Sequence, residues 1–247
     1  MSPVLFGLAL ALALVLLGLL RRHGARLRAR LAVFRGWFVP TLGLGAVTVF
    51  GKIAEDVHER ETTGFDRAVS LGFHRLDSPA MDAIMRAFTF LGSFPAIATV
   101  VLAAVIVCLR NRDRRGAAFV AGVAAFEELL NLALKETFRR ARPSLFEEIA
   151  TLHSYSFPSG HAMTAAATYG AIAVLVARTR ADRAAAAYAI SIWVALLIGA
   201  SRVYLGVHWI TDVLAGWSAG AFVLLAGVYL LTRADARGPA PGPRPSR

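Results

Sequence analysis

Charged residues are scarce in this sequence. Of its 247 residues, 17% are charged and 57% are hydrophobic, whereas a soluble domain carries about 25% charged and about 45–50% apolar residues. These proportions argue against an ordinary soluble enzyme, and the high hydrophobicity excludes a disordered chain. Cysteine is nearly absent as well. The single Cys108 lies in an apolar run, so the chain cannot form an intramolecular disulfide, and we expect a buried, inert thiol there.

Lysine and acidic residues are also few, which gives the charge an unusual distribution. The chain has 27 Lys plus Arg against 16 Asp plus Glu, a formal net charge of +11, and its only lysines are Lys52 and Lys135. A nucleic-acid-binding protein gathers its basic residues on a soluble surface. Here most arginines stand in short clusters between long apolar runs. This pattern is typical of the cytoplasmic loops of a polytopic membrane protein, so we expect a bilayer and no nucleic acid as partner.

Seven apolar runs approach or reach the length of a membrane span, which is roughly 17–25 residues for a bilayer core about 30 Å thick. They occupy residues 4–20, 37–53, 84–109, 117–134, 162–176, 184–200 and 210–231. We therefore predict an all-α fold, a polytopic transmembrane helix bundle with six core spans and one extra N-terminal span. A cleaved signal peptide is the alternative for the first run. The arginines follow that run and do not precede it, which favours a retained helix.

The arginines also predict the orientation of the bundle. They follow the first, third, fifth and seventh runs, and these four segments fall on one side if seven helices alternate. By the positive-inside rule that side is the cytoplasm, so the N-terminus is expected outside and the C-terminus inside. The comparatively acidic segment 55–82 then lies outside.

Three polar stretches interrupt the apolar pattern, and all three lie on the outer side in this topology. The last of them contains Arg202, His208 and Asp212. His208 and Asp212 are four residues apart and share a face if the segment is helical. A carboxylate bonded to one imidazole nitrogen leaves the other nitrogen as a nucleophile or a base. An ion pair on a helix surface is the alternative interpretation of this pair.

The middle stretch reads Ser156-Phe-Pro-Ser-Gly-His161. Pro158 suits a chain that turns into a helix. Ser159 and Gly160 then offer a hydroxyl and backbone N–H groups at a helix N-terminus, which attracts anions such as phosphate. His161 follows and can donate a proton to a leaving oxygen. An ordinary helix start with an interfacial histidine is the alternative.

The first stretch adds cations near the end of the fourth run. Lys135 and Arg142 are seven residues apart, about two helical turns, so they can face the same way and hold phosphate oxygens. For Arg139 and Arg140 we expect interfacial cations that contact water or anionic headgroups. Taken together, the three stretches supply two histidines, an orienting carboxylate and three cations. That set suits phosphoryl transfer through a covalent phosphohistidine.

The motifs K-x6-RP, PSGH and SR-x5-H-x3-D occur together and in this order. This combination resembles the signature of the type 2 phosphatidic acid phosphatase superfamily. The resemblance covers residues 37–231. Within them, residues 65–93, which contain Asp66 and Leu91-Gly-Ser, resemble the region before the family's third core helix. It implies that His208 is the nucleophile, that Asp212 orients it, and that His161 is the acid and later the base. The phosphate-binding residues implied by the resemblance are Lys135, Arg142, Ser159, Gly160 and Arg202. It implies no metal and no cofactor.

These observations predict three regions: an N-terminal span with a basic loop (1–36), a lipid phosphatase membrane domain (37–232) and a disordered cytoplasmic tail (233–247). The expected substrates are phosphatidylglycerol phosphate, phosphatidic acid, undecaprenyl pyrophosphate or a lipid A phosphate. The expected location is the bacterial cytoplasmic membrane, with the site on the periplasmic face. Glu127, Glu128 and Asn131 lie inside the fourth run, where a functional role and a packing role both stay open.

Three other functions compete with this hypothesis. A lipid phosphotransferase would share the phosphohistidine step and pass the phosphoryl group to a lipid alcohol. A transporter would suit seven spans, but its site usually lies near the midplane, whereas the polar stretches here gather on one face. A vanadium haloperoxidase resembles the same pocket, but those proteins are soluble.

Overall fold

The computed structural model describes residues 37–144 and 154–237, so the predicted first span, residues 4–20, lies outside them. The elements are a first helix, Trp37–His58, followed by α2 (Thr63–His74), α3 (Pro79–Leu91), α4 (Phe94–Arg110), α5 (Arg114–Phe138), α6 (Gly160–Thr164), the π-helix η2 (Ala165–Tyr169), α7 (Gly170–Thr179), the 3-10 turn η3 (Ala181–Arg183), α8 (Ala184–Tyr204) and α9 (Ile210–Ala236). No β-strand occurs in the two described ranges, and the predicted all-α class is confirmed.

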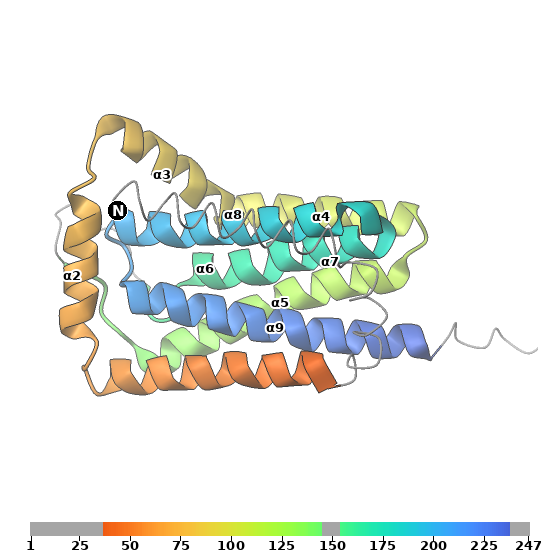
Figure 1. The fold of residues 1–247 in the computed structure, drawn as a ribbon, viewed down its shortest axis with the longest axis horizontal. Coiled ribbons are helices and arrows are strands. Elements are labelled where there is room, and N and C mark those ends of the chain that lie inside the picture. Colours follow the sequence, from red (N-terminus) through yellow and green to blue (C-terminus); the bar gives the residue numbers. More distant parts are fainter. Residues whose placement is uncertain (1–36, 145–153, 238–247) are drawn as a thin grey trace, which may run out of the picture.

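The long helices run side by side along one direction, and α2 lies across one end of the bundle (Figure 1). Five described helices are long and apolar enough to cross a membrane, or six if α3 and α4 together form one span. Large apolar side chains such as Phe94, Leu129 and Ile190 are exposed on the outside of the bundle. Such a surface is stable against lipid tails and unstable against water. The chain is therefore a multi-pass membrane protein.

The predicted third span, residues 84–109, is broken into two helices. α3 and α4 meet at an angle of 48° near Gly92. Pro95 explains the break, because a proline has no N–H to donate and its ring clashes with the carbonyl four residues earlier. That carbonyl belongs to Leu91, and it accepts a hydrogen bond from the Tyr169 hydroxyl at 2.8 Å.

The remaining predicted spans correspond to helices whose ends lie further out than the apolar runs. The run 117–134 becomes α5, which begins at Arg114, and the run 210–231 becomes α9, which continues to Ala236. The reason is that polar residues at a helix end reach water or headgroups while their backbone stays helical. The apolar length of a run therefore underestimates the length of its helix.

α9 packs closely on α6 because glycines lie at the contact. A Cβ atom at Gly216 would lie 2.6 Å from the carbonyl oxygen of Ser159, and one at Gly220 would lie 2.3 Å from that of Met163. Glycines four residues apart allow membrane helices to approach in this way. The contact places the start of α6 beside the start of α9, where the N–H of Ser159 donates to the carbonyl of Asp212 at 2.9 Å.

Candidate active site

A cavity of about 730 Å³ connects the residues of the three polar stretches. Its polar part lies at the end of the bundle that α2 covers, where α5 ends and α6 and α9 begin (Figure 1). Six of the eight predicted site residues line it: Lys135, Arg142, Gly160, His161, Arg202 and His208. The other two, Ser159 and Asp212, are fully buried next to lining residues. The fold therefore brings all eight residues together, although they come from segments that are far apart in the chain.

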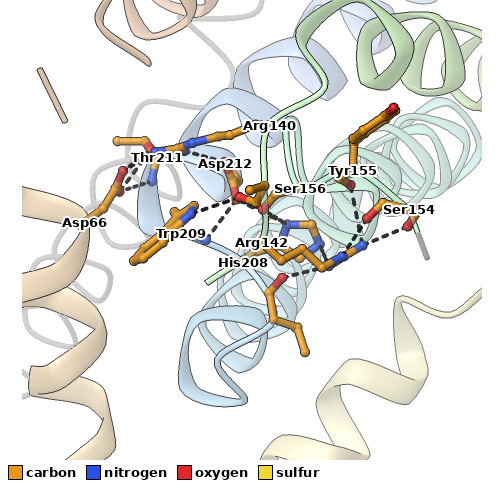
Figure 2. Close-up of polar contacts among 12 residues, drawn as sticks. Asp66, Arg140, Arg142, Ser154, Tyr155, Ser156, His208, Trp209, Thr211 and Asp212 are labelled. Carbon is orange, nitrogen blue, oxygen red and sulfur yellow. Dashed lines mark hydrogen bonds and ion pairs between the residues drawn. The ribbon is translucent and has the colours of Figure 1, made fainter. Parts of the chain in front are cut away.

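His208 lies in the short connection before α9 and contacts different partners through its two ring nitrogens (Figure 2). Nε2 lies 3.2 Å from Nη1 of Arg142, and Nδ1 lies 3.4 Å from Oδ2 of Asp212. A guanidinium only donates hydrogen bonds, so Nε2 is the acceptor and carries a lone pair, while Nδ1–H faces the carboxylate. Burial lowers the pKa of His208 to about 3, so the ring is neutral near pH 7.

Asp212 is held in one orientation by several donors. It is the third residue of α9, and its Oδ2 accepts the backbone N–H of Trp209 at 2.9 Å. The hydroxyl of Ser156 also donates to Oδ2, and Nη1 of Arg140 lies 2.5 Å from Oδ1. A fully buried carboxylate with this many donors stays charged and does not rotate. It can therefore orient the His208 ring and stabilise a positive charge on it.

The expectation that Arg140 is an interfacial cation is wrong. Its side chain is only 15% exposed and bridges two buried carboxylates, with Nη2 at 2.6 Å from Asp66 and Nη1 at 2.5 Å from Asp212. The chain turns inward here because Arg139, the residue that ends α5, has a left-handed backbone with a φ of 44°. Arg139 itself is exposed and pairs with Glu136 at 3.3 Å, as expected for a cation at the interface.

Asp66 connects α2 to the start of α9. It is 1% exposed, and its carboxylate accepts the backbone N–H of Thr211 at 3.1 Å and the Thr211 hydroxyl at 2.8 Å. Because Arg140 bridges Asp66 and Asp212, α2 is linked to the residue that orients His208 (Figure 2). The sequence singled out Asp66 only through the resemblance, because one acid in a polar segment has no spacing signal.

Arg142 is fixed by backbone carbonyls on both sides of the cavity. Its Nε donates to the carbonyl of Ser154 at 2.8 Å, and its Nη1 donates to that of Val207 at 2.7 Å. Burial lowers the pKa of Arg142 from its ordinary value, although a guanidinium remains protonated in a protein. Arg142 thus presents a positively charged group beside Nε2 of His208 without moving.

Two further cations face the cavity from α5 and α8. Nζ of Lys135 donates to the carbonyl of Tyr155 at 2.6 Å. Arg202 is only 8% exposed, and one of its Nη atoms donates to the hydroxyl of Thr89. Its Nε has no hydrogen-bond partner within residues 37–144 and 154–237. A buried donor without a partner suits an anionic ligand, because an anion satisfies it and offsets its charge.

Glycines and a buried serine shape the start of α6. A Cβ atom at Gly160 would lie 2.7 Å from Nδ2 of Asn131, so a larger residue there would displace the Asn131 amide. A Cβ atom at Gly92 would lie 3.0 Å from Cδ2 of His161, so Gly92 makes room for that ring. Oγ of Ser159 is buried and has no partner in the described part of the chain. The His161 ring faces the same cavity as His208.

Ser156 and Arg140 belong to the site, and the sequence predicted a site role for neither of them. Ser156 stands inside a polar stretch that the sequence did identify, but a single loop serine is not distinguished by spacing. Arg140 is one of three arginines within four positions, and helical periodicity does not extend past Phe138, where α5 ends. The geometry as a whole is a cationic cavity beside a neutral, oriented imidazole, which is suited to bind a phosphate group and to attack it.

Residues 116–235 match the family model of the PAP2 superfamily. Phosphatidylglycerophosphatase B of Bacillus subtilis is 32% identical over 180 residues, which are 71% of this chain and 88% of that protein. Lipid A 1-phosphatase of Rhizobium johnstonii is 34% identical over 125 residues, 47% of this chain and 48% of that protein.

A solved structure has the same fold. The crystal structure of a transmembrane PAP2-type phosphatidylglycerolphosphate phosphatase from Bacillus subtilis aligns with a TM-score of 0.72 at 28% sequence identity. The alignment covers 80% of this chain and 97% of that one. The family match, the relative aligned over most of its length and the shared fold agree with the motifs that surround the cavity, and this chain belongs to the PAP2 superfamily.

Proposed function

We propose that this protein hydrolyses the phosphate group of a membrane lipid through a phosphohistidine on His208. The observation that carries the proposal is the surroundings of the His208 ring. Its Nε2 lone pair faces a cavity beside Arg142, Lys135 and Arg202, while its Nδ1–H faces the buried Asp212. The expected enzyme class, a hydrolase of phosphoric monoesters or pyrophosphates, is confirmed by the phosphatases to which the chain is related.

The reaction has two steps in this geometry. Nε2 of His208 attacks phosphorus, the bond from phosphorus to the lipid oxygen breaks, and His161 gives that oxygen a proton. Water then attacks the phosphohistidine, gives a proton to His161, and releases inorganic phosphate with both histidines restored. The cations stabilise the charge on the equatorial oxygens in both steps. No residue of this scheme needs a metal ion, so EDTA is expected to leave it intact.

The cavity also fits a substrate that keeps its tail in the bilayer. Much of its wall beyond the cations consists of apolar side chains of α4 and α5, among them Ile97, Val101 and Leu129. Glu127, Glu128 and Asn131 of α5 also line it. Leu129 is exposed on the outside of the bundle, so the apolar part of the cavity adjoins the lipid-facing surface. Among the four expected substrates, the relative that aligns over 88% of its length favours phosphatidylglycerol phosphate.

We place the site at the periplasmic face of a bacterial cytoplasmic membrane. The site lies at the end of the bundle covered by α2, and the arginine-rich connections α4–α5 and α7–α8 lie at the opposite end, together with the end of α9 (Figure 1). The positive-inside rule assigns that opposite end to the cytoplasm. We keep residues 37–232 as the catalytic membrane domain, with residues 1–36 as an added span and loop and residues 233–247 as a cytoplasmic tail.

The test is phosphate release by the purified full-length chain in detergent. With phosphatidylglycerol phosphate as substrate, we expect inorganic phosphate and phosphatidylglycerol, at the same rate with and without EDTA. His208→Ala removes the nucleophile and should reduce release to the uncatalysed level. Phosphate labelled with ³²P should also become bound to the wild-type protein after rapid quenching, and not to His208→Ala.

A folding control makes the result interpretable. Size-exclusion elution and thermal unfolding of His208→Ala should match the wild type, because the polar partners of the imidazole in the described residues lie in loops and at a helix start. Turnover by this variant at the wild-type rate would refute the covalent step. Transfer of label to an added lipid alcohol, with no free phosphate, would instead identify a phosphotransferase.

A further inference from the structure

α5 carries a line of polar side chains that leads from the phosphate-binding residues into the membrane. Lys135, Asn131 and Glu127 are each four residues apart and therefore lie on one face of the helix. All three line the same cavity as His208. Asn131 lies about 6 Å and Glu127 about 12 Å along the axis from Lys135, at a rise of about 1.5 Å per residue. The proposed chemistry uses Lys135 and neither of the other two.

Glu127 is a buried acid with acceptor capacity to spare. It is 1% exposed, and the Thr164 hydroxyl lies 2.9 Å from each of its carboxylate oxygens. A hydroxyl has one hydrogen, so it can satisfy only one of these oxygens at a time. Within the described ranges no Lys or Arg forms an ion pair with Glu127. An acid inside a membrane helix is costly to bury, and such residues generally have a function.

Asn131 provides a second acceptor on the same wall. Its side chain is 6% exposed, and its Oδ1 has no hydrogen-bond partner in the described part of the chain. Its Nδ2 lies against Gly160, at 2.7 Å from where a Cβ atom would stand. The amide is therefore packed in place with its oxygen unsatisfied. A buried acceptor without a donor is energetically unfavourable, and a donor on a ligand would relieve that cost.

The two acceptors lie at the depth in the cavity that the substrate atoms next to a bound phosphate would occupy. Thr164, the partner of Glu127, is three residues after His161 on the same helix, roughly 5 Å further from the phosphate-binding end. A phosphate held between His161 and His208 places the following carbons of its substrate beside Asn131 and Glu127. Past these residues the cavity wall becomes apolar, so the acceptors face the headgroup and not the tail.

We propose that Glu127 and Asn131 form a subsite that accepts a hydrogen bond from a hydroxyl on the headgroup carbons next to the scissile phosphate. The subsite rests on the function proposed above and defines its substrate class. Glycerol-type headgroups with a free hydroxyl supply such a donor. Ester carbonyls of a diacylglycerol and the carbons of a prenyl chain supply none, so lipids of those kinds leave both acceptors unsatisfied.

The experiment compares two substrates that differ by one hydroxyl. The first is phosphatidylglycerol phosphate, and the second is the same lipid with 1,3-propanediol in place of the headgroup glycerol. The wild type should show a value of kcat/KM about tenfold or more higher for the glycerol lipid, as expected when buried acceptors lose their donor. Glu127→Leu should bring this ratio close to one, mainly through a higher KM for the glycerol lipid.

The matched control is Glu136→Gln, an exposed glutamate on the same helix, which should keep the wild-type ratio. Glu127→Gln keeps shape and one acceptor and should give an intermediate ratio. If both lipids are hydrolysed by the wild type at equal kcat/KM, the subsite is refuted while the proposed function stands, even if Glu127→Leu cannot be purified. Glu127→Leu with an unchanged ratio also refutes it. If the wild type hydrolyses neither lipid but releases phosphate from phosphatidic acid or undecaprenyl pyrophosphate, the subsite is refuted and the proposed function stands. If it hydrolyses none of these lipids, both fail.

Discussion

The imidazole of His208 lies between a cation and a carboxylate. His208 has a cation on its Nε2 side and a carboxylate on its Nδ1 side, at 3.2 and 3.4 Å. Arg142 cannot accept a hydrogen bond, and Asp212 cannot donate one while charged, so the two contacts define one tautomer. This arrangement directs the lone pair of a neutral ring toward the cavity, which is the requirement for attack on phosphorus.

Substitution of Arg140 should lower both the stability of the protein and its catalytic rate. Arg140→Gln removes the charge between Asp66 and Asp212, and breaking a buried pair in this way costs about 3–5 kcal/mol. We expect a lower unfolding temperature and a fall in kcat of about a hundredfold or more, because Asp212 loses a donor that orients it. Thermal unfolding in detergent and phosphate release measure the two effects.

The neighbouring Arg139 is the matched control for Arg140. Its exposed pair with Glu136 is worth about 0–1 kcal/mol, so Arg139→Gln should retain both stability and activity. Equal effects of the two substitutions would show that the buried bridge has no special role. Wild-type activity in Arg140→Gln would show that Asp212 is oriented by Ser156 and Trp209 alone.

At the scale of elements, the site depends on how closely α9 approaches α6. Gly216 and Gly220 allow the contact, and the contact places the PSGH segment beside Asp212. The break between α3 and α4 serves the same region, because Gly92 at that break leaves space for the His161 ring. Small residues at helix contacts therefore determine the position of both histidines.

Gly216→Ala tests this dependence. The added methyl group would lie 2.6 Å from the carbonyl oxygen of Ser159, a backbone atom that cannot move alone, so the helices must separate. Overpacking of this kind costs about 1–3 kcal/mol, and we expect lower thermal stability together with reduced phosphate release. Gly122→Ala on α5 is the control, since a Cβ atom there would have no neighbour within 4 Å. Unaltered activity in Gly216→Ala would mean that the α6–α9 distance does not matter.

At the scale of the whole molecule, charge is distributed unequally between the two ends of the described bundle. The connections opposite the site carry arginines, and Arg178 there pairs with Asp113 at 3.1 Å and Asp235 at 3.0 Å, which joins α7 to α5 and α9. At the site end, basic residues such as Lys52, Arg60 and Arg67 stand among acidic residues such as Glu55, Glu59 and Glu61. This asymmetry is the physical basis for the proposed orientation.

Cysteine labelling in intact cells tests that orientation. In a Cys108→Ala background, Glu61→Cys lies in the exposed connection before α2, and Asp182→Cys lies in the exposed turn η3 between α7 and α8. A membrane-impermeant maleimide should label Glu61→Cys from the outside and should label Asp182→Cys only after the cells are opened. The reverse pattern would place the site in the cytoplasm.

Much of the fold and several site residues could be predicted from the sequence, because the sequence patterns that indicate them are local. The length of an apolar run depends on helix geometry alone, so it predicted the helical class. The spacing of four residues between His208 and Asp212 pointed to the right pair, but His208 precedes α9, so the two residues do not share a helix face as predicted. The motifs did not show that Arg140 turns inward. Its partners Asp66 and Asp212 stand 74 and 72 residues away in the chain, and no local periodicity connects them.

Only the tertiary structure determines the surroundings of the residues that stand between the motifs in the sequence. Packing of α5 against the start of α6 buries Asn131 and Glu127 beside the cavity, where we propose that their acceptors bind the headgroup. The sequence left these residues open between function and packing, because helical spacing defines a face but not the neighbour of that face. Which face meets a cavity is set by contacts between helices that are distant in sequence, and only the folded chain contains them.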